Sequence, residues 1–251
     1  MPPRRKATET LQLPLLGDAQ PDRGAPDLLR PADGYRCGDL EAEASRRGWD
    51  LLIGLDEAGR GPLAGPVVAA ACSLPPGRLA EAAALGLDDS KRHDEAAREA
   101  LFGWITAHAR AFAVAIVSAE DIDAMNILRA SLHAMRLAWD DVVAADPPLV
   151  TARVLVDGRD RAPLPEATWQ QPLIKGDGRS LNVAAASILA KVTRDRWMDA
   201  AHAQFPVYGF DRHRGYPTPA HRDAIAQHGP CPLHRRSFTL LPADGRPIDA
   251  A

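Results

Sequence analysis

The stretch DLLIGLDEAGRGPLAGPVVAAA, residues 50–71, contains two apolar runs on either side of a turn rich in glycine and proline. Short apolar runs bounded by turn residues are typical of buried strands, so the stretch predicts a strand pair at the centre of a fold. Asp56 and Glu57 lie where the first run ends, beside a turn that contains Arg60. Glycine-rich turns expose N–H groups that attract anions, and the stretch therefore raises the question of what two acids bind there.

Outward from this stretch, apolar runs alternate with segments of helical periodicity. We expect further strands at 111–118, at 152–158 and within 169–178, and helices at 93–109, 119–145 (one helix or a pair), 179–205 and 218–229. The 179–205 segment has small residues on one side, which allow close approach to a sheet. Two strands followed by alternating strands and helices predict an α/β fold with helices on the faces of a mixed sheet.

The composition is that of a soluble globular protein, with 46% hydrophobic and 25% charged residues among 251. No run approaches the roughly 20 apolar residues of a membrane span, and the start lacks the apolar segment of a signal peptide, so we expect a cytoplasmic protein. Cys37, Cys72 and Cys231 lie far apart, which is typical of reduced cysteines. Residues 1–150 carry a net charge of −7 and residues 151–251 one of +4, a distribution that permits nucleic-acid binding without requiring it.

Residues 1–45 are rich in proline, glycine, arginine and aspartate and lack sustained periodicity, so we predict a disordered extension there. The main folded domain is expected to span residues 46–205. A C-terminal segment, 206–251, is rich in histidine, arginine, glycine and proline.

Four acidic side chains lie at predicted strand ends or loops: Asp56, Glu57, Asp157 and Asp177. Open α/β sheets place their chemistry at such ends, although adjacent residues of a strand face opposite sides. Asp56 and Glu57 are expected to share a site because the glycines at 59 and 61 break the pleat. Clustered carboxylates repel unless they bind hard cations such as Mg²⁺ or Mn²⁺. The alternative is that Asp157 and Asp177 are ordinary turn residues, or that Asp177 caps the following helix.

Seven blocks of the sequence occur in a recognisable order. They are GLDEAGRGPLAGPVVAAA, DDSKR, VLVDG, IKGD, AAASILAKVTRDRWM, YGFDRHRGYPTPAH and PLHRRSF. Over residues 49–240 the chain resembles bacterial ribonuclease HII. The resemblance implies a ribonuclease H-like three-layer fold, with a five-stranded mixed sheet flanked by helices and a helical C-terminal segment. It also implies cleavage of the RNA strand of RNA–DNA hybrids and nicking 5′ of single ribonucleotides in duplex DNA, giving 3′-OH and 5′-phosphate ends. On this basis residues 46–205 form the catalytic domain, and residues 206–251 complete the substrate-binding surface.

The resemblance assigns roles to individual residues. The four metal ligands of the family fall on Asp56, Glu57, Asp157 and Asp177, which would hold two Mg²⁺ or Mn²⁺ ions. Gly59, Arg60 and Gly61 match the segment that reaches the ribose through main-chain atoms, and Tyr216 matches the tyrosine that bonds the 2′-OH. For Tyr216 the alternative is a half-buried packing residue. Candidate phosphate contacts are Ser90, Lys91, Ser187 and Lys191. Asp195, inside a predicted helix, is interpreted as structural.

The remaining polar residues of the C-terminal segment give weaker indications. The pairs Arg212 with Arg214 and Arg235 with Arg236 could widen a basic surface for DNA. His213, His221 and His234 have no common zinc spacing, so we expect them to contact nucleic acid or to be structural. The sequence from residue 240 onward shows no clear sliding-clamp motif. The expected partners are RNA–DNA hybrid and ribonucleotide-containing duplex DNA, bound by a monomer with no membrane association.

Three other functions fit the sequence less well. Ribonuclease HIII shares the fold but carries a folded N-terminal domain and lacks the Gly-Arg-Gly segment. A catalytically silent nucleic-acid-binding module would be indicated by the loss of an acidic ligand, and all four are present. A nucleotide-binding switch protein would need a phosphate-binding loop of the G-x-x-x-x-G-K-[ST] type, which the sequence lacks.

Overall fold

The computed structural model describes residues 37–88 and 90–241, and its centre is a five-stranded sheet with the order β3-β2-β1-β4-β5. The strands are β1 Leu52–Ala58, β2 Val67–Ser73, β3 Ala111–Val117, β4 Arg153–Asp157 and β5 Gln170–Leu173. β2 runs antiparallel to both β1 and β3, whereas β1, β4 and β5 are mutually parallel. The predicted mixed sheet is therefore confirmed.

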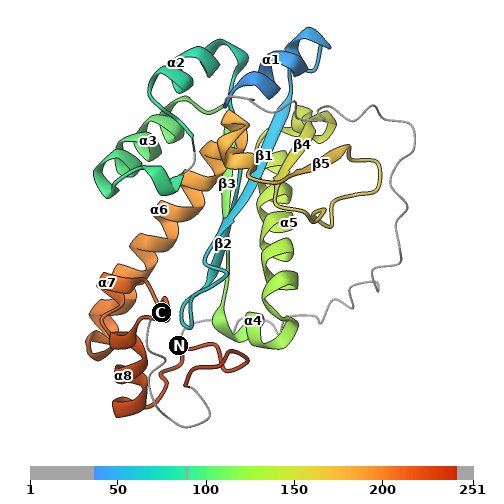
Figure 1. The fold of residues 1–251 in the computed structure, drawn as a ribbon. Coiled ribbons are helices and arrows are strands. Elements are labelled where there is room, and N and C mark those ends of the chain that lie inside the picture. The colour runs from blue at the N-terminus through green and yellow to red at the C-terminus, as the bar shows by residue number, and fades with distance from the viewer. Residues whose placement is uncertain (1–36, 89, 242–251) are drawn as a thin grey trace, which may run out of the picture.

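Helices cover both faces of this sheet (Figure 1). Their bounds are α1 Asp39–Arg46, α2 Leu79–Ala84, α3 Glu95–His108, α4 Ala119–Met125, α5 Ile127–Ala145, α6 Leu181–Gln204, α7 Phe210–His213 and α8 Pro219–His228. The segment predicted as one helix or a pair is a pair, because Asn126 adopts a positive φ of 71° between α4 and α5. Its side chain accepts a hydrogen bond from the backbone N–H of Arg129, and so caps α5.

Alternate residues of the strands feed two separate cores. Ile53 and Leu55 of β1 pack with apolar residues of α5 on one face, while Val68 and Ala70 of β2 pack with α3 and α6 on the other. Four alanines of α6 are fully buried, as expected from its small residues: Ala184, Ala185, Ala186 and Ala190. At Gly54 the backbones of β1 and α6 come so close that a Cβ would lie 2.1 Å from the carbonyl carbon of Asn182.

The helix α1 lies, except for its last residue, within the range 1–45 predicted to be a disordered extension. Leu40 and Ala44 are both 1% exposed, and they pack against the fold. The prediction is therefore wrong for residues 39–45, whereas residues 1–36 lie outside the described part of the chain.

Glu41 explains why α1 is held in place. Its carboxylate oxygen Oε1 accepts hydrogen bonds from Ser180 Oγ at 2.6 Å, from Asn182 N at 3.1 Å and from Asn182 Nδ2 at 3.0 Å. These donors lie at the N-terminus of α6, where backbone N–H groups have no partner within the helix. Ser180 is also the N-cap of α6 and accepts from the N–H of Val183. The extension thus supplies an acid that completes the start of α6.

The C-terminal segment packs on the far end of α6 (Figure 1). Phe210 and Ile225 join Met198 of α6 and Leu63 of the glycine-rich turn in a third apolar cluster. The turn and the C-terminal segment are therefore parts of one structure. No helix among the described residues is long and apolar enough to cross a bilayer. Residues 242–251, part of the region searched for a clamp motif, are not described.

Candidate active site

Three of the acidic residues lie at one edge of the sheet because β1, β4 and β5 are parallel. Asp56 lies near the end of β1, Asp157 is the last residue of β4, and Asp177 follows β5 in the short helix Gly176–Gly178. The register pairs Leu55 with Val156, so Asp56 and Asp157 come one residue later on both strands. The carboxyl ends of parallel strands thus bring together residues that lie more than one hundred positions apart.

Glu57 is placed differently from the prediction. β1 stays paired with β2 through Ala58, so the pleat does not break after Asp56, and that expectation is wrong. Continued pairing therefore does not by itself turn the Glu57 side chain toward Asp56, although its charge is near enough to raise the pKa of Asp56. The Glu57 carboxylate accepts a hydrogen bond from Arg60 Nη1 at 3.3 Å. The break comes only at Gly59, where φ is 100°.

Asp56 has the most perturbed environment of the four acids. It is 5% exposed. Burial, with the negative charges of Asp157, Glu57 and Asp177 adding to it, raises the pKa of Asp56 well above its ordinary value, while a hydrogen bond with Ser187 lowers it. The three other carboxylates are therefore near enough to repel the ionised form of Asp56, which is the electrostatic condition that a bound cation relieves.

Each of the other carboxylates is also held by a donor of the protein. The N–H of Gly176 donates to Asp157 Oδ1 at 2.7 Å, and the N–H of Gly178 donates to Asp177 Oδ1 at 3.0 Å. Asp177 is therefore in a turn, but it does not cap α6, since Ser180 does so. Across residues 37–88 and 90–241, no three histidine, cysteine or acidic side chains are grouped as closely as a preformed metal site requires.

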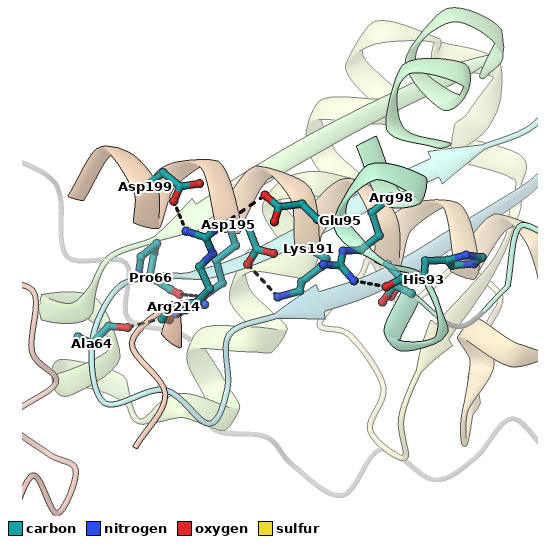
Figure 2. Close-up of polar contacts among 12 residues, drawn as sticks. Ala64, Pro66, His93, Glu95, Arg98, Lys191, Asp195, Asp199 and Arg214 are labelled. Carbon is teal, nitrogen blue, oxygen red and sulfur yellow. Dashed lines mark hydrogen bonds and ion pairs between the residues drawn. The ribbon is translucent and has the colours of Figure 1, made fainter. Parts of the chain in front are cut away.

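The candidate phosphate contacts are arranged along α6. Ser187 Oγ lies 2.9 Å from Ser90 Oγ, and both side chains are buried, so this pair supports Asp56 from the helix side. One turn later Lys191 Nζ donates to Asp195 Oδ1 at 2.8 Å, and Figure 2 shows the two side chains pointing toward each other. Asp195 is thus the partner of a lysine within its own helix. The side chain of Lys91 lies outside what the structure describes.

The Gly-Arg-Gly turn lies beside the predicted tyrosine. A Cβ on Gly61 would lie 3.6 Å from Tyr216 Cε1, so the two residues are neighbours although 155 positions separate them. Tyr216 is 43% exposed, so a large part of the residue faces solvent. Arg60 and Gly61 are exposed and lie with Tyr216 next to the end of β1, whereas Gly59 is buried.

Two buried arginines hold this turn, a role that sequence reasoning did not predict. Arg235, 0% exposed, donates to the carbonyl oxygens of Gly59, Arg60, Gly65 and Pro66 at 2.6, 3.1, 3.0 and 3.1 Å. Arg194, 1% exposed, donates to those of Ala64, Pro66 and Arg214 at 3.2, 3.0 and 3.0 Å. Figure 2 shows the carbonyls of Ala64 and Pro66 on the turn beside α6. Charged donors make strong hydrogen bonds to carbonyls, so the turn is rigidly held from inside.

The predicted basic surface is correspondingly smaller. Arg235 is buried, and its guanidinium donates to carbonyl oxygens of the turn, so its assignment to a DNA-binding surface is wrong. Arg214 forms ion pairs with Asp199 and, at 3.7 Å, with Glu95, as Figure 2 shows. Arg212 and Arg236, one from each predicted pair, are exposed. The backbone N–H of Arg236 donates to Asp123.

Comparisons with known proteins agree with this arrangement. A family model described as ribonuclease HII matches residues 53–241. The chain is 50% identical over 199 residues to the ribonuclease HII of Syntrophotalea carbinolica, covering 79% of this chain and 90% of that protein. The ribonuclease H2 of Pyrococcus horikoshii is 27% identical, with a TM-score of 0.58 and coverage of 75% of this chain and 94% of that one. The Bst ribonuclease HIII in complex with Mn²⁺ is 22% identical, with a TM-score of 0.62 and coverage of 78% and 70%, and it shows the likeness of fold alone.

Proposed function

The chain belongs to the ribonuclease HII family of metal-dependent endoribonucleases, and on this premise we propose that it hydrolyses the RNA strand of RNA–DNA hybrids and nicks duplex DNA 5′ of a single ribonucleotide. The products would carry 3′-OH and 5′-phosphate ends. The main support is that three parallel strands bring Asp56, Asp157 and Asp177 to one edge. We further propose a cytoplasmic monomer in which residues 46–205 are catalytic and residues 206–251 complete the substrate-binding surface.

The acidic residues fit divalent cations by their chemistry. All the donors are carboxylates, and oxygen ligands select hard ions such as Mg²⁺ and Mn²⁺. Two such ions, held by Asp56, Glu57, Asp157 and Asp177, would supply an activated water and charge stabilisation for the leaving 3′ oxygen. The raised pKa of Asp56 supports this assignment, because a cation would stabilise its ionised form.

Residues beside the acids are proposed to recognise the substrate. Gly59, Arg60 and Gly61 would contact the ribose through main-chain atoms, and Tyr216 would donate to the 2′-OH, the group that distinguishes RNA from DNA. The exposure of Tyr216 and its position next to Gly61 support this role. Lys91, Lys191, Ser90 and Ser187 are proposed to lie along the strand backbone, with the buried serine pair acting through Asp56.

The test uses a DNA duplex that contains one ribonucleotide, with Mg²⁺ or Mn²⁺ present. The unmutated protein is expected to nick it, and Asp177→Asn is expected to lose at least about a hundredfold in rate, since it removes a charge from the reacting centre. Asp140→Asn is the matched control, because its carboxylate pairs with Arg136 within α5 and is not proposed to bind metal or substrate. No nicking by the unmutated protein, or equal nicking by it and Asp177→Asn, would disprove the proposal.

Substrate choice separates the proposal from its alternatives. A ribonuclease HIII-like nuclease would cleave the all-RNA hybrid but not the duplex with one ribonucleotide, and a silent binding module would cleave neither. Tyr216→Phe, which lacks only the hydroxyl, is expected to slow nicking by about tenfold or more, the effect of one lost hydrogen bond in a transition state. An unchanged nicking rate in both Tyr216→Phe and Tyr216→Ala would remove the tyrosine from the proposed site.

A further inference from the structure

Three histidines of the C-terminal segment form a cluster that the proposed chemistry does not use. The rings of His213 and His221 stack with centroids 4.4 Å apart, and His221 Nε2 lies 3.1 Å from His234 Nε2. His221 is 0% exposed and His234 is 2% exposed. Buried polar atoms at this density need a consistent set of donors and acceptors, so the protonation of each ring can be worked out from its neighbours.

The contacts leave one neutral arrangement for His221 and His234. His221 Nδ1 lies 2.9 Å from the carbonyl oxygen of Tyr216, which can only accept, so Nδ1 donates and Nε2 is left as an acceptor. The N–H of Cys231 donates to His234 Nδ1 at 3.0 Å, which makes His234 Nε2 the donor to His221. If His234 Nδ1 instead donated to the Cys231 carbonyl at 3.3 Å, two acceptors would face each other at 3.1 Å. The proton order is therefore His234 to His221 to the Tyr216 carbonyl.

The electrostatic surroundings favour this neutral state. Burial lowers the pKa of both His221 and His234 to about 4. The positive charge of Arg236 lowers the pKa of His234 further. Both rings are thus uncharged at neutral pH, and each presents one donor and one acceptor.

The cluster meets the substrate-facing surface at the backbone of Tyr216. The N–H of Tyr216 donates to the carbonyl of His213 at 2.8 Å, and its own carbonyl accepts from His221 and from the N–H of Thr218, the latter at 2.8 Å. The preceding N–H, that of Gly215, donates to His213 Nδ1 at 3.2 Å. The backbone of this exposed tyrosine is therefore fixed by histidines on its buried side.

We propose that His221 is a positioning residue for ribonucleotide discrimination: its Nδ1–H, oriented by His234, holds the Tyr216 carbonyl so that the tyrosine ring stands at the sugar beside Gly61. The proposal rests on the proposed function, because it gives Tyr216 the sugar-reading role. A shift of one ångström in a contacting group is enough to reduce a rate by about a hundredfold, so a residue that fixes the backbone of Tyr216 affects discrimination without touching the substrate.

The proton order provides a paired test. An asparagine amide can replace a donor at the Nδ1 position, and a glutamine amide can replace one at the Nε2 position. At His221 the essential donor is Nδ1, so His221→Asn is expected to keep discrimination and His221→Gln to lose it. At His234 the essential donor is Nε2, so the pattern reverses: His234→Gln keeps discrimination and His234→Asn loses it. A merely structural role would not produce this exchange of partners between the two positions.

Discrimination is measured through kcat/KM on the duplex with a single ribonucleotide, in which the only 2′-OH is the one that Tyr216 would contact. We expect this kcat/KM to fall about tenfold in His221→Gln and His234→Asn, the effect of one lost hydrogen bond, and to stay within about twofold of the unmutated protein in the other two variants. If both variants at a position behave alike, the proposal is overturned.

Amide hydrogen exchange over residues 214–218 gives a readout that does not depend on activity. Faster exchange is expected in His221→Gln than in His221→Asn at equal global stability, because the contact to the Tyr216 carbonyl is lost only in the former. Equal exchange in the two variants overturns the proposal even if activity changes. Failure of the unmutated protein to nick the single-ribonucleotide duplex would instead disprove the proposed function, while the exchange comparison would still show whether His221 holds Tyr216.

Discussion

Gly54→Ala tests the contact on which the geometry of the site depends. The added methyl group would lie 2.1 Å from the carbonyl carbon of Asn182, 2.3 Å from its oxygen and 2.3 Å from the nitrogen of Val183. All three atoms belong to the backbone of α6 and its first turn, so no side chain can rotate away. Ordinary contact begins at about 3.4 Å, a little inside the optimum carbon–carbon separation, and α6 must therefore move about 1.3 Å from β1.

The expected effects are on both stability and activity. Overpacking of a core costs about 1–3 kcal/mol of stability. The cost of Gly54→Ala is expected at the upper end of this range, because the atoms that the methyl group meets belong to the backbone. For a chain of this size each kcal/mol lowers Tm by about 2–4 °C, so the expected fall is about 6–12 °C. The helix also carries Ser187, which contacts Asp56. A displacement of one ångström can reduce a rate by about a hundredfold, and a comparable loss of nicking is expected in the fraction that stays folded.

Gly103→Ala is the matched control. Gly103 lies within α3, and a Cβ there would have nothing within 4 Å. The same substitution should therefore raise stability by about 0.5–1 kcal/mol, because alanine is the better helix former, and leave nicking unchanged. Thermal unfolding followed by circular dichroism, with a nicking assay at 25 °C, measures both effects. If Gly54→Ala unfolds at the temperature of the unmutated protein and nicks at the same rate, the inferred contact between β1 and α6 is wrong.

Two further predictions concern buried acids. Glu41→Ala removes the acceptor of three hydrogen bonds at the start of α6 and should lower the free energy of unfolding by about 2–4 kcal/mol. The control Glu43→Ala removes only surface ion pairs to arginines and should lower it by less than about 1 kcal/mol. Equal effects of the two variants in urea unfolding would contradict the role given to Glu41. Asp56→Asn should abolish nicking yet raise Tm at pH 7–8 when no divalent ions are present. The reason is that the pKa of Asp56 is raised in the folded protein, so its ionisation costs stability as pH rises. The gain in Tm should shrink in acid, and a Tm below that of the unmutated protein at pH 7–8 would contradict this prediction.

The parts of the fold that the sequence predicted are those set by local pattern. The apolar runs ending at Asp56 and Asp157 are short and bounded by turn residues, so their strand character needed no tertiary information. Their meeting at one edge depends on β1 and β4 being parallel, which the local pattern does not specify and the structure shows. The predicted break in the pleat after Asp56 was wrong because the sequence does not show how far the pairing of β1 with β2 continues. The pairing continues through Ala58.

The parts that the sequence missed depend on contacts between distant segments. α1 has few apolar residues and lies in a region rich in breakers, and its attachment comes from Glu41 bonding to residues about 140 positions later. Arginine is almost never fully buried without a partner, so Arg194 and Arg235 look like surface residues in any local window. Their partners are carbonyl oxygens of the glycine-rich turn, and a carbonyl carries no sequence signature.

These arginines also change the meaning of the glycines in the opening stretch. From the sequence, Gly59 and Gly61 are expected to break the pleat of the first strand and, by the family resemblance, to let the backbone approach a sugar. A Cβ on Gly59 would lie 2.2 Å from Arg194 Nε and 2.8 Å from the Pro66 carbonyl oxygen, so this glycine is required by the protein interior. Gly61 meets only Tyr216 Cε1, at an ordinary contact distance of 3.6 Å. The turn is thus divided: one glycine lets the buried arginine pack beneath it, and the other lies beside the exposed tyrosine where a sugar would be read.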